Sequence, residues 1–273
     1  MFASDAPTPA ILRPPPAFSN KTAGILRTLK WALCFKVIPL LMMFSCVVAS
    51  VSAQNQKQSE IARVELAFAG KSLDEINSWL TAMRPPAVDP ADKLLLMREL
   101  PFCTPANRIE NPRELDRLRK RLVPVLKLYA RDGVVDLVLF RDPRPIVYSR
   151  AGVVVAISTE VLKIVGEDDA ALAGIIAHEL AHEYVALQLL QALQAKDLGK
   201  IRELELFCDG VAVVMMLDLG LDPARYGQIL ETIANHSQAA AVLNNGSNSH
   251  PEVAARRRVI SDLSARFKKA LHR

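Results

Sequence analysis

The pattern of apolar and polar positions predicts a mostly helical chain after residue 110, because apolar residues recur there every three or four positions. One helix is expected to begin at Pro112, with Asn111 as its cap, and to be disturbed at Pro124. Further helices are expected over about 168–195, about 201–219, from Pro223 to about 236, and over 251–270.

Two runs rich in β-branched residues interrupt this helical pattern. They are "VVDLVLF" at 134–140 and "IVYSRAGVVVAIS" at 145–158, and the turn-like "RDPRP" separates them. Before them, residues 54–110 are expected to form helical pieces broken by "RPPAVDP" and "TPANRIENP". The sequence therefore predicts an α+β fold, in which a small, mostly antiparallel sheet packs on the helix at 168–195 and on the helix that follows it.

The first 53 residues have the composition of a leader segment. A Pro-rich start and spaced cations precede "VIPLLMMFSCVVASVSA" (37–53), in which Val51 and Ala53 fit the small-residue rule for signal-peptide cleavage. The alternative is an uncleaved membrane tether, because residues 31–53 contain one charge, Lys36, and a bilayer needs about 20 apolar residues. Both interpretations predict that the rest of the chain is exported to a periplasmic or other extracytoplasmic compartment.

The charge distribution argues against a nucleic-acid partner. The chain has a formal net charge of +5, but the first 53 residues alone carry five cations and one acid, a net +4. The rest of the chain is therefore near +1. Phosphate binding needs Lys and Arg clustered on the folded domain, and this balance does not provide them.

After the leader, the chain contains two cysteines, Cys103 and Cys208. An exported compartment permits a disulfide between them. The apolar surroundings of Cys208 in its predicted helix favour the other interpretation, that it is a small buried residue with a free thiol.

The stretch "AGIIAHELAHEYVALQ" (173–188) places histidines and acids in an apolar helix. His178 and His182 are four residues apart, so they lie on one face with Cβ atoms about 5–6 Å apart and can bind one ion. Glu179 lies about 100° round the helix from His178, where it can reach a water on that ion without binding the ion itself. "HELAH" therefore matches the HExxH zinc motif.

A catalytic zinc site needs a third protein ligand. The histidine that metzincins have six positions after the second motif histidine is absent, because Gln188 occupies that position. The next predicted helix offers Glu205 and Asp209, four residues apart in an apolar stretch, where a buried acid needs a partner. We expect Glu205 to bind zinc and Asp209 to orient a ligand histidine. Glu203 is the competing ligand, at a position expected to be more solvated.

Three motifs in this order, "HELAH", "ELFCD" and "SHPEVAARR", resemble the HtpX and CAAX-prenyl-protease family of zinc peptidases (metallopeptidase family M-48, gluzincin clan). That family combines HExxH with an ExxAD motif and a later His-Pro segment that ends in arginine. The resemblance extends over roughly residues 115–262 and includes the predicted strands before the histidine helix. It implies a zinc metallopeptidase domain at 111–273, with a zincin-like fold, one zinc ion per chain and protein or peptide substrates.

The resemblance also implies roles for single residues. Glu205 corresponds to the third zinc ligand, His250 to a histidine near the metal that stabilises the reacting carbonyl or gates the site, and Arg256 to a supporting arginine. Cys208 departs from the pattern, because it replaces the usual Ala of ExxAD. The multi-span region of the integral-membrane members is not found either, so the chain is most similar to the small exported members. Unfolded or damaged envelope proteins are therefore the expected substrates.

The expected mechanism is hydrolysis of a peptide bond by a zinc-activated water, with Glu179 as general base. A peptide is expected to lie extended along residues 152–158 by β-strand addition. The alternative function is a non-catalytic assembly factor or chaperone-like scaffold that keeps the zinc site, although a scaffold would not need Glu179. Residues 237–249 are predicted to form either an access loop or a plain connector.

Overall fold

The computed structural model describes residues 56, 58–85, 92–93, 96–97, 100–241 and 251–271. The predicted leader lies outside these ranges, as do residues 242–250 with most of the predicted access loop. Among the described helices, none is both long and apolar enough to cross a bilayer. Gln54–Arg273 form one compact unit.

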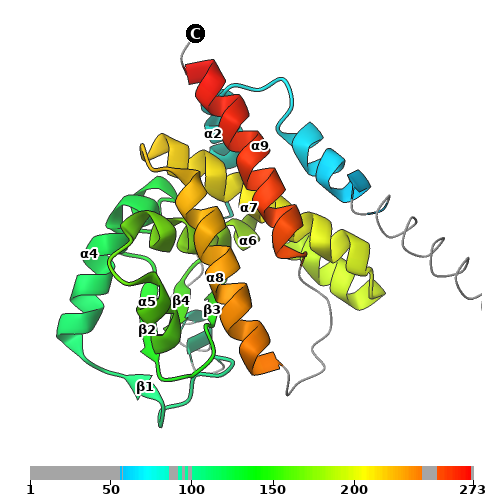
Figure 1. Cartoon of the computed structure of the whole chain (residues 1–273). Helices are drawn as coiled ribbons and strands as arrows, with labels where there is room; N and C mark the ends of the chain where they lie inside the picture. Colours follow the sequence, from blue (N-terminus) through cyan, green and yellow to red (C-terminus); the bar gives the residue numbers. More distant parts are fainter. Residues whose placement is uncertain are drawn as a thin grey trace, which may run out of the picture. The chain divides into compact units, whose positions relative to one another are not determined.

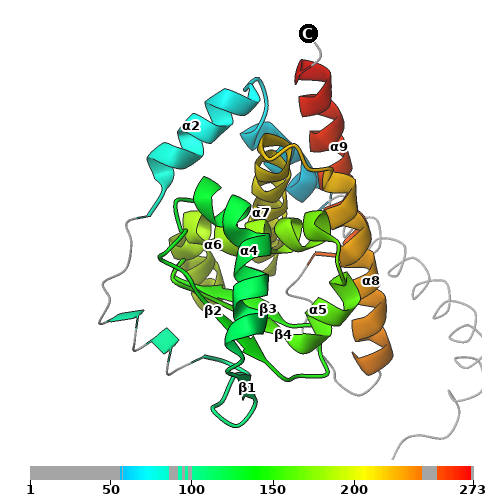
Figure 2. The same ribbon diagram turned by 90° about the vertical axis from the view of Figure 1, so that its left-hand side faces the viewer.

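The fold is α+β, as predicted, and helices dominate it (Figure 1). The helices whose bounds the structure describes are α2 (Leu73–Met83), α4 (Pro112–Leu128), α5 (Thr159–Val165), α6 (Asp169–Ala195), α7 (Leu198–Asp218), α8 (Pro223–Ala241) and α9 (Val253–Leu271), and residues 58–67 are helical as well. The strands are β1 (Arg108–Ile109), β2 (Asp136–Phe140), β3 (Val147–Arg150) and β4 (Val154–Ser158). α6 packs against α7 and α8, α7 packs against α9, and α4 packs against β2 and α6 (Figure 2).

The predicted cap begins α4, but the predicted disturbance does not end it. Asn111 accepts a hydrogen bond from the Arg113 backbone N–H (3.1 Å), and Pro112 occupies the first turn, where its missing N–H costs nothing. α4 continues past Pro124 to Leu128. Pro124 is exposed, so water can satisfy the carbonyl that the proline leaves without a helical partner.

The described strands form one mixed sheet in the order β1-β2-β4-β3. β1 and β2 pair antiparallel, as do β3 and β4, whereas β2 and β4 pair parallel. The prediction of a mostly antiparallel sheet is therefore right for the two outer pairs and wrong for the central pair. The run at 145–158 contains two strands, because Ala151 (φ 48°) and Gly152 (φ 61°) form a tight turn inside it.

This strand order contradicts the prediction that a peptide adds along residues 152–158. β4 is paired on both edges, with Val155 opposite Leu137 of β2 on one side and opposite Ser149 of β3 on the other. Its backbone groups are therefore engaged on both sides and cannot accept an additional strand. β3 is the last strand of the described sheet on that side, and it lies beside α6.

The sheet separates two apolar clusters, because successive side chains of a strand point to opposite faces. Leu137 and Val155 belong to the larger cluster, which they share with the helices. Val138 and Val154 belong to a smaller cluster on the other face, together with Cys103. The two faces are thus both buried, which explains the near-continuous apolar character of β2 and β4.

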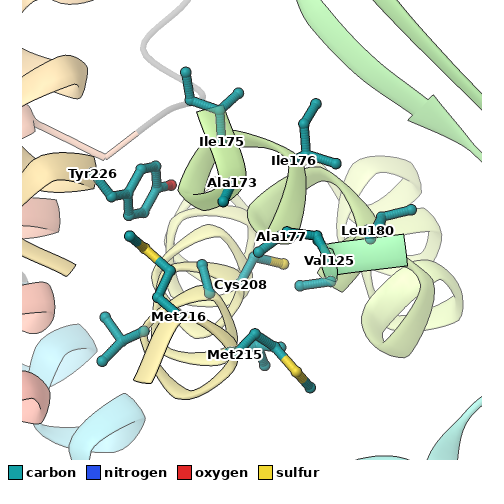
Figure 3. Close-up of a cluster of buried hydrophobic side chains, with 14 of the residues drawn as sticks. Val125, Ala173, Ile175, Ile176, Ala177, Leu180, Cys208, Met215, Met216 and Tyr226 are labelled. Carbon is teal, nitrogen blue, oxygen red and sulfur yellow. The ribbon is translucent and has the colours of Figure 1, made fainter. Parts of the chain in front are cut away.

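Cys208 lies in the larger cluster, where α6 meets α7 (Figure 3). Ala173 and Ala177 of α6 are small, so they allow the two helices to pack closely at this point (Figure 3). Cys103 and Cys208 belong to different clusters, and both thiols are free. The interpretation of Cys208 as a small buried residue is therefore confirmed.

The segment before α4, whose role the sequence leaves open, covers the outer side of α7. Phe68 stacks on Phe207 of α7 with ring centroids 5.5 Å apart, and Trp79 meets the same ring edge-on at 5.9 Å. Within the described part of the chain, two apolar clusters form the core of the unit Gln54–Arg273. This unit contains its own core, so we expect it to fold without the leader.

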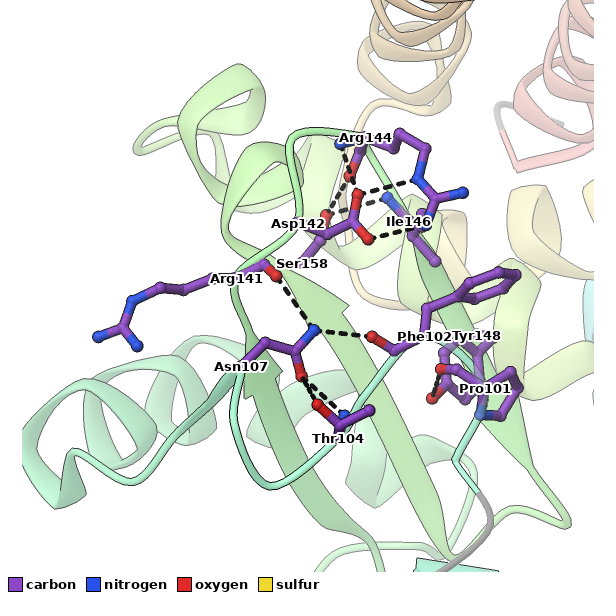
Figure 4. Close-up of polar contacts among 10 residues, drawn as sticks. All are labelled: Pro101, Phe102, Thr104, Asn107, Arg141, Asp142, Arg144, Ile146, Tyr148 and Ser158. Atoms are coloured by element: carbon purple, nitrogen blue, oxygen red, sulfur yellow. Dashed lines mark hydrogen bonds and ion pairs between the residues drawn. The ribbon is translucent and has the colours of Figure 1, made fainter. Parts of the chain in front are cut away.

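Hydrogen bonds fasten the connection between β2 and β3 and the segment that precedes β1 (Figure 4). Ser158 Oγ accepts a hydrogen bond from the Ile146 backbone N–H (2.9 Å) and donates to the Arg144 carbonyl (2.8 Å). The Tyr148 hydroxyl of β3 donates to the Pro101 carbonyl (2.5 Å). These bonds fix β3 and the neighbouring segment in position as one wall of the groove described below.

Candidate metal centre

α6 brings the HELAH residues together near its middle. Asp168 caps the helix by accepting a hydrogen bond from the Ala171 backbone N–H (2.9 Å). The rings of His178 and His182 have centroids 5.0 Å apart, with their planes at 89°. Ligand atoms of His178, Glu179 and His182 all lie within 4.8 Å of one another, so this group can hold a metal ion.

α7 places Glu205 opposite the two imidazoles. Its Oε2 lies 3.5 Å from His178 Nε2, and its Oε1 lies 3.7 Å from His182 Nε2. Neighbouring ligand atoms of a tetrahedral zinc site are about 3.3–3.6 Å apart, given metal bonds of about 2.0–2.2 Å. The three side chains are therefore spaced closely enough to share one ion after small adjustments.

Asp209 stands behind His178, one turn after Glu205, and is completely buried. Its Oδ1 lies 2.9 Å from His178 Nδ1, so it can accept a hydrogen bond from the Nδ1–H and leave Nε2 directed toward Glu205. Arg256 of α9 donates to both carboxylate oxygens of Asp209 (2.8 and 2.6 Å), and the Tyr226 hydroxyl of α8 donates to Oδ1 (2.6 Å). Burial raises the pKa of Asp209, but Arg256 and His178 together hold it well below its usual range.

The surroundings give the two histidines opposite pKa shifts. Burial and the Arg256 charge lower the pKa of His178, but Asp209 and Glu205 outweigh them and raise it to about 9. Burial, followed by the charge of His178, lowers the pKa of His182 to about 4. The negative potential that raises the pKa of His178 also favours a metal cation between these residues.

His182 has a different outer neighbour from His178. Its Nδ1 lies 3.6 Å from Cys208 Sγ, whereas its Nε2 faces Glu205. Burial raises the pKa of the Cys208 thiol well above its usual value, so the thiol stays protonated. Cys208 is thus placed beside the nitrogen of His182 that points away from Glu205.

Glu179 is anchored through its backbone, and its side chain is partly buried in the site. Its carbonyl oxygen accepts a hydrogen bond from the Ser149 hydroxyl (2.6 Å), which ties α6 to β3. Burial raises the pKa of the Glu179 carboxyl to about 7, and the negative charge of Glu205 contributes while the charge of His178 opposes the shift. A carboxyl group with a pKa near neutrality can both accept and donate a proton.

A groove of about 920 Å³ runs past the metal-binding group and has a mostly apolar lining. Tyr148 and Ser149 of β3 line one side, and Leu190 and Leu193 from the C-terminal half of α6 line another. Ile233 of α8 adds to the apolar lining. The groove can therefore take a partly apolar molecule.

The structure brings together six of the seven residues that the sequence analysis assigned to the site. They are His178, Glu179, His182, Glu205, Asp209 and Arg256. The seventh, His250, lies outside the described residues. The competing ligand Glu203 is engaged elsewhere, because its carboxylate pairs with Arg63 (2.9 Å) and Lys200 (2.6 Å).

Sequence reasoning missed two residues that support this site, Ser149 and Tyr226. Each acts through a contact between elements far apart in the chain, and no local motif marks either one. For Tyr226, one signal in the sequence is the glycine at position 174 in the middle of an apolar helix. Gly174 of α6 lets α8 approach, because a Cβ at that position would lie 2.5 Å from the Cβ of Tyr226.

Comparison with protein-family models and with curated proteins finds no match for this chain. The resemblance to zinc peptidases therefore rests on the three sequence motifs. The geometry of the described residues stands independently of that resemblance.

Proposed function

We propose that this chain is a zinc-dependent metalloendopeptidase with a zincin-like fold, acting on unfolded or damaged proteins in an exported compartment. The observation that carries the proposal is the position of Glu205, whose carboxylate oxygens lie 3.5 and 3.7 Å from Nε2 of the two motif histidines. Two imidazoles and one carboxylate, with a further glutamate beside them, are the donor set of a hydrolytic zinc site.

His178, His182 and Glu205 would hold the ion. When bound, zinc lowers the pKa of a coordinated water to about 7 and polarises the carbonyl of the substrate. Glu179 accepts a proton from the attacking water as the new C–O bond forms, and it returns a proton to the amine nitrogen as the C–N bond breaks. Asp209 keeps the His178 ring oriented throughout, because its carboxylate accepts a hydrogen bond from the Nδ1–H.

β3 is the strand best placed to bind the substrate backbone. It is an edge strand of the described sheet, it borders the groove, and Ser149 ties it to the backbone of Glu179. An extended peptide that adds to this edge would pass directly beside the general base. The apolar side chains along the groove would then receive apolar residues of the peptide, which folded proteins bury and unfolded proteins expose.

The location of this activity rests on the leader sequence. Its apolar run and its small residues before Gln54 support export, whether the segment is cleaved or retained as a tether. The near-neutral charge balance after residue 53 continues to favour a polypeptide substrate over a nucleic acid.

The test compares purified 54–273 with its Glu179→Gln variant, measuring zinc content and the cleavage of casein with and without a chelator. The proposal predicts about one zinc ion per chain in both proteins and chelator-sensitive cleavage by the parent alone. Zinc in both proteins without cleavage in either would instead favour the non-catalytic scaffold. A parent that binds no zinc would contradict the ligand assignment.

A further inference from the structure

The C-terminal end of α6 and the first residue of α7 expose an unusual number of leucines. We call residues 187–198 the α6–α7 tip; Figure 1 shows it in yellow-green, at the end of these helices that lies away from the sheet. Seven large apolar side chains are exposed in the described part of the chain, and four of them belong to this tip. They are Leu187 (65%), Leu190 (52%), Leu193 (53%) and Leu198 (47%).

The tip is also poor in charge. Residues 184–195 contain no Asp, Glu, Lys or Arg, and the polar positions after Tyr184 are glutamines. Exposed helices of soluble domains normally carry charges of both signs on their solvent face. In the tip itself, Lys196 and Asp197 are the charged residues, and the Asp197 carboxylate is used to cap α7 by accepting from the Lys200 backbone N–H (2.9 Å). An exposed patch of leucines with few charges around it marks an interaction surface.

The tip lies beside the beginning of the described chain. A Cβ built on Gly199 would lie 3.0 Å from Gln56 Nε2 and 3.5 Å from Glu60 Oε1. Arg202 of α7 holds Glu60 through a buried ion pair (2.8 Å), so this neighbourhood is fixed. The apolar run at 37–53 ends three residues before Gln56, and three residues span at most about 11 Å. The described chain therefore begins beside the tip, and the apolar run precedes this beginning directly in sequence.

We propose that the α6–α7 tip docks on the surface of a lipid membrane. Leucines on an otherwise uncharged helix end are suited to the boundary between headgroups and acyl chains, and Lys196 can extend to the headgroups. The proposal concerns lipid binding and does not depend on peptidase activity. Because Leu190 and Leu193 also line the groove, docking would place that end of the groove at the membrane surface.

The test measures lipid contact of the tip in the full chain, reconstituted in vesicles of phosphatidylcholine with one quarter phosphatidylglycerol. The leader cysteines Cys34 and Cys46 are replaced by Ser, and the buried Cys103 and Cys208 stay unlabelled under native conditions. An environment-sensitive fluorophore is attached through Leu193→Cys. The matched control is Leu66→Cys, because Leu66 is the same residue type, is 71% exposed and lies outside the tip.

We expect the fluorophore at position 193 to shift to the blue on reconstitution and to be quenched severalfold more by doxyl-labelled lipid than the fluorophore at position 66. A second label through Leu187→Cys should behave like the first, and far-ultraviolet circular dichroism checks that each variant is folded. Equal quenching at positions 193 and 66 would overturn the proposal. A blue shift without lipid quenching would also overturn it, because the tip would then be covered by protein, either the leader or a second copy.

Discussion

Glu179 and Glu183 each follow one of the two motif histidines, yet their surroundings differ. Both side chains line the groove, but Glu179 lies near Glu205, and burial raises its pKa to about 7. The Glu183 side chain is only 6% exposed and is held by Arg131, which donates to Oε2 from Nε (3.2 Å) and from a terminal nitrogen (2.5 Å). One carboxyl group is placed to exchange a proton, whereas the other holds α6 in position.

This difference comes from segments far from the motif. Arg131 follows α4 in sequence and also donates to the Pro85 carbonyl (2.9 Å), so its guanidinium ties α6 to a second segment. Gly152 of the β3–β4 turn lies against the same carboxylate, because a Cβ there would be 1.8 Å from Glu183 Oε1. A His-Glu pair on a helix therefore does not identify a general base, and the partners of the acid decide its role.

The largest expected effect separates the two acids by activity. Glu179→Gln should lower kcat/KM for casein-derived peptides by about 10²–10⁴-fold, because it removes the proton acceptor while keeping the shape of the side chain. Glu183→Gln should keep most of its cleavage at temperatures where it stays folded. Peptide cleavage assays on both variants, each checked for zinc content, make this comparison. Similar losses in the two variants would show that the assignment of the base is wrong.

The second effect separates the two acids by stability. Glu183→Gln should lower the free energy of unfolding by about 3–5 kcal/mol, because it leaves the buried Arg131 without its counter-charge. The double variant Arg131→Met, Glu183→Leu removes both charges. It should lose less free energy of unfolding than the sum of the losses for these two substitutions made singly. Urea unfolding of the single and double variants measures this coupling. Strict additivity would contradict a buried, coupled pair.

A third effect tests the close approach of the β3–β4 turn to Glu183. Gly152→Ala combines a positive φ of 61° with a clash against the carboxylate, so it should destabilise more than its matched control. The control is Gly133→Ala, because Gly133 has a φ of 75° and nothing within 4 Å of the added Cβ. The control should cost about 1–2 kcal/mol, the usual cost of this conformation for a residue with a Cβ. Equal melting temperatures for the two variants would argue against the close approach.

The smallest expected effects concern zinc affinity and the residues next to Nδ1 of the two histidines, Asp209 beside His178 and Cys208 beside His182. Asp209→Asn should weaken zinc binding by about 10–100-fold, because it removes a charged acceptor of the His178 Nδ1 proton. Cys208→Ala should change zinc affinity less, because a neutral thiol 3.6 Å from His182 Nδ1 is a weak partner. Competition with a chromophoric chelator measures both affinities. A larger loss with Cys208→Ala than with Asp209→Asn would show that Cys208, and not Asp209, is the more important neighbour of the ligand histidines.

Much of the helical framework could be predicted from local signals. The expected histidine helix at about 168–195 corresponds to α6, and the next one at about 201–219 corresponds to α7, because periodicity and caps are local properties. The sheet was predicted less well. The parallel pairing of β2 with β4 depends on a turn at Ala151 and Gly152 inside one apolar run, and that run does not reveal which strand becomes central.

The residues of the candidate site also differ in whether local sequence signals reveal them. His178 and His182 could be found from sequence, because spacing within a helix determines which side chains share a face. Glu205 could be proposed because an acid in an apolar helix needs a partner, although its contact with the histidines depends on how α6 and α7 pack. The roles of Ser149, Tyr226 and Arg131 could not, because each depends on how elements distant in sequence pack together.

We propose that Glu205, and not the neighbouring Glu203, completes the zinc site with the two motif histidines. The most direct measurement is the zinc affinity of 54–273 and of its Glu205→Gln and Glu203→Gln variants. We predict that Glu205→Gln loses more affinity than the roughly 10–100-fold expected for loss of an outer partner, whereas Glu203→Gln binds zinc like the parent. Retention of zinc by Glu205→Gln, or its loss in Glu203→Gln alone, would contradict the account.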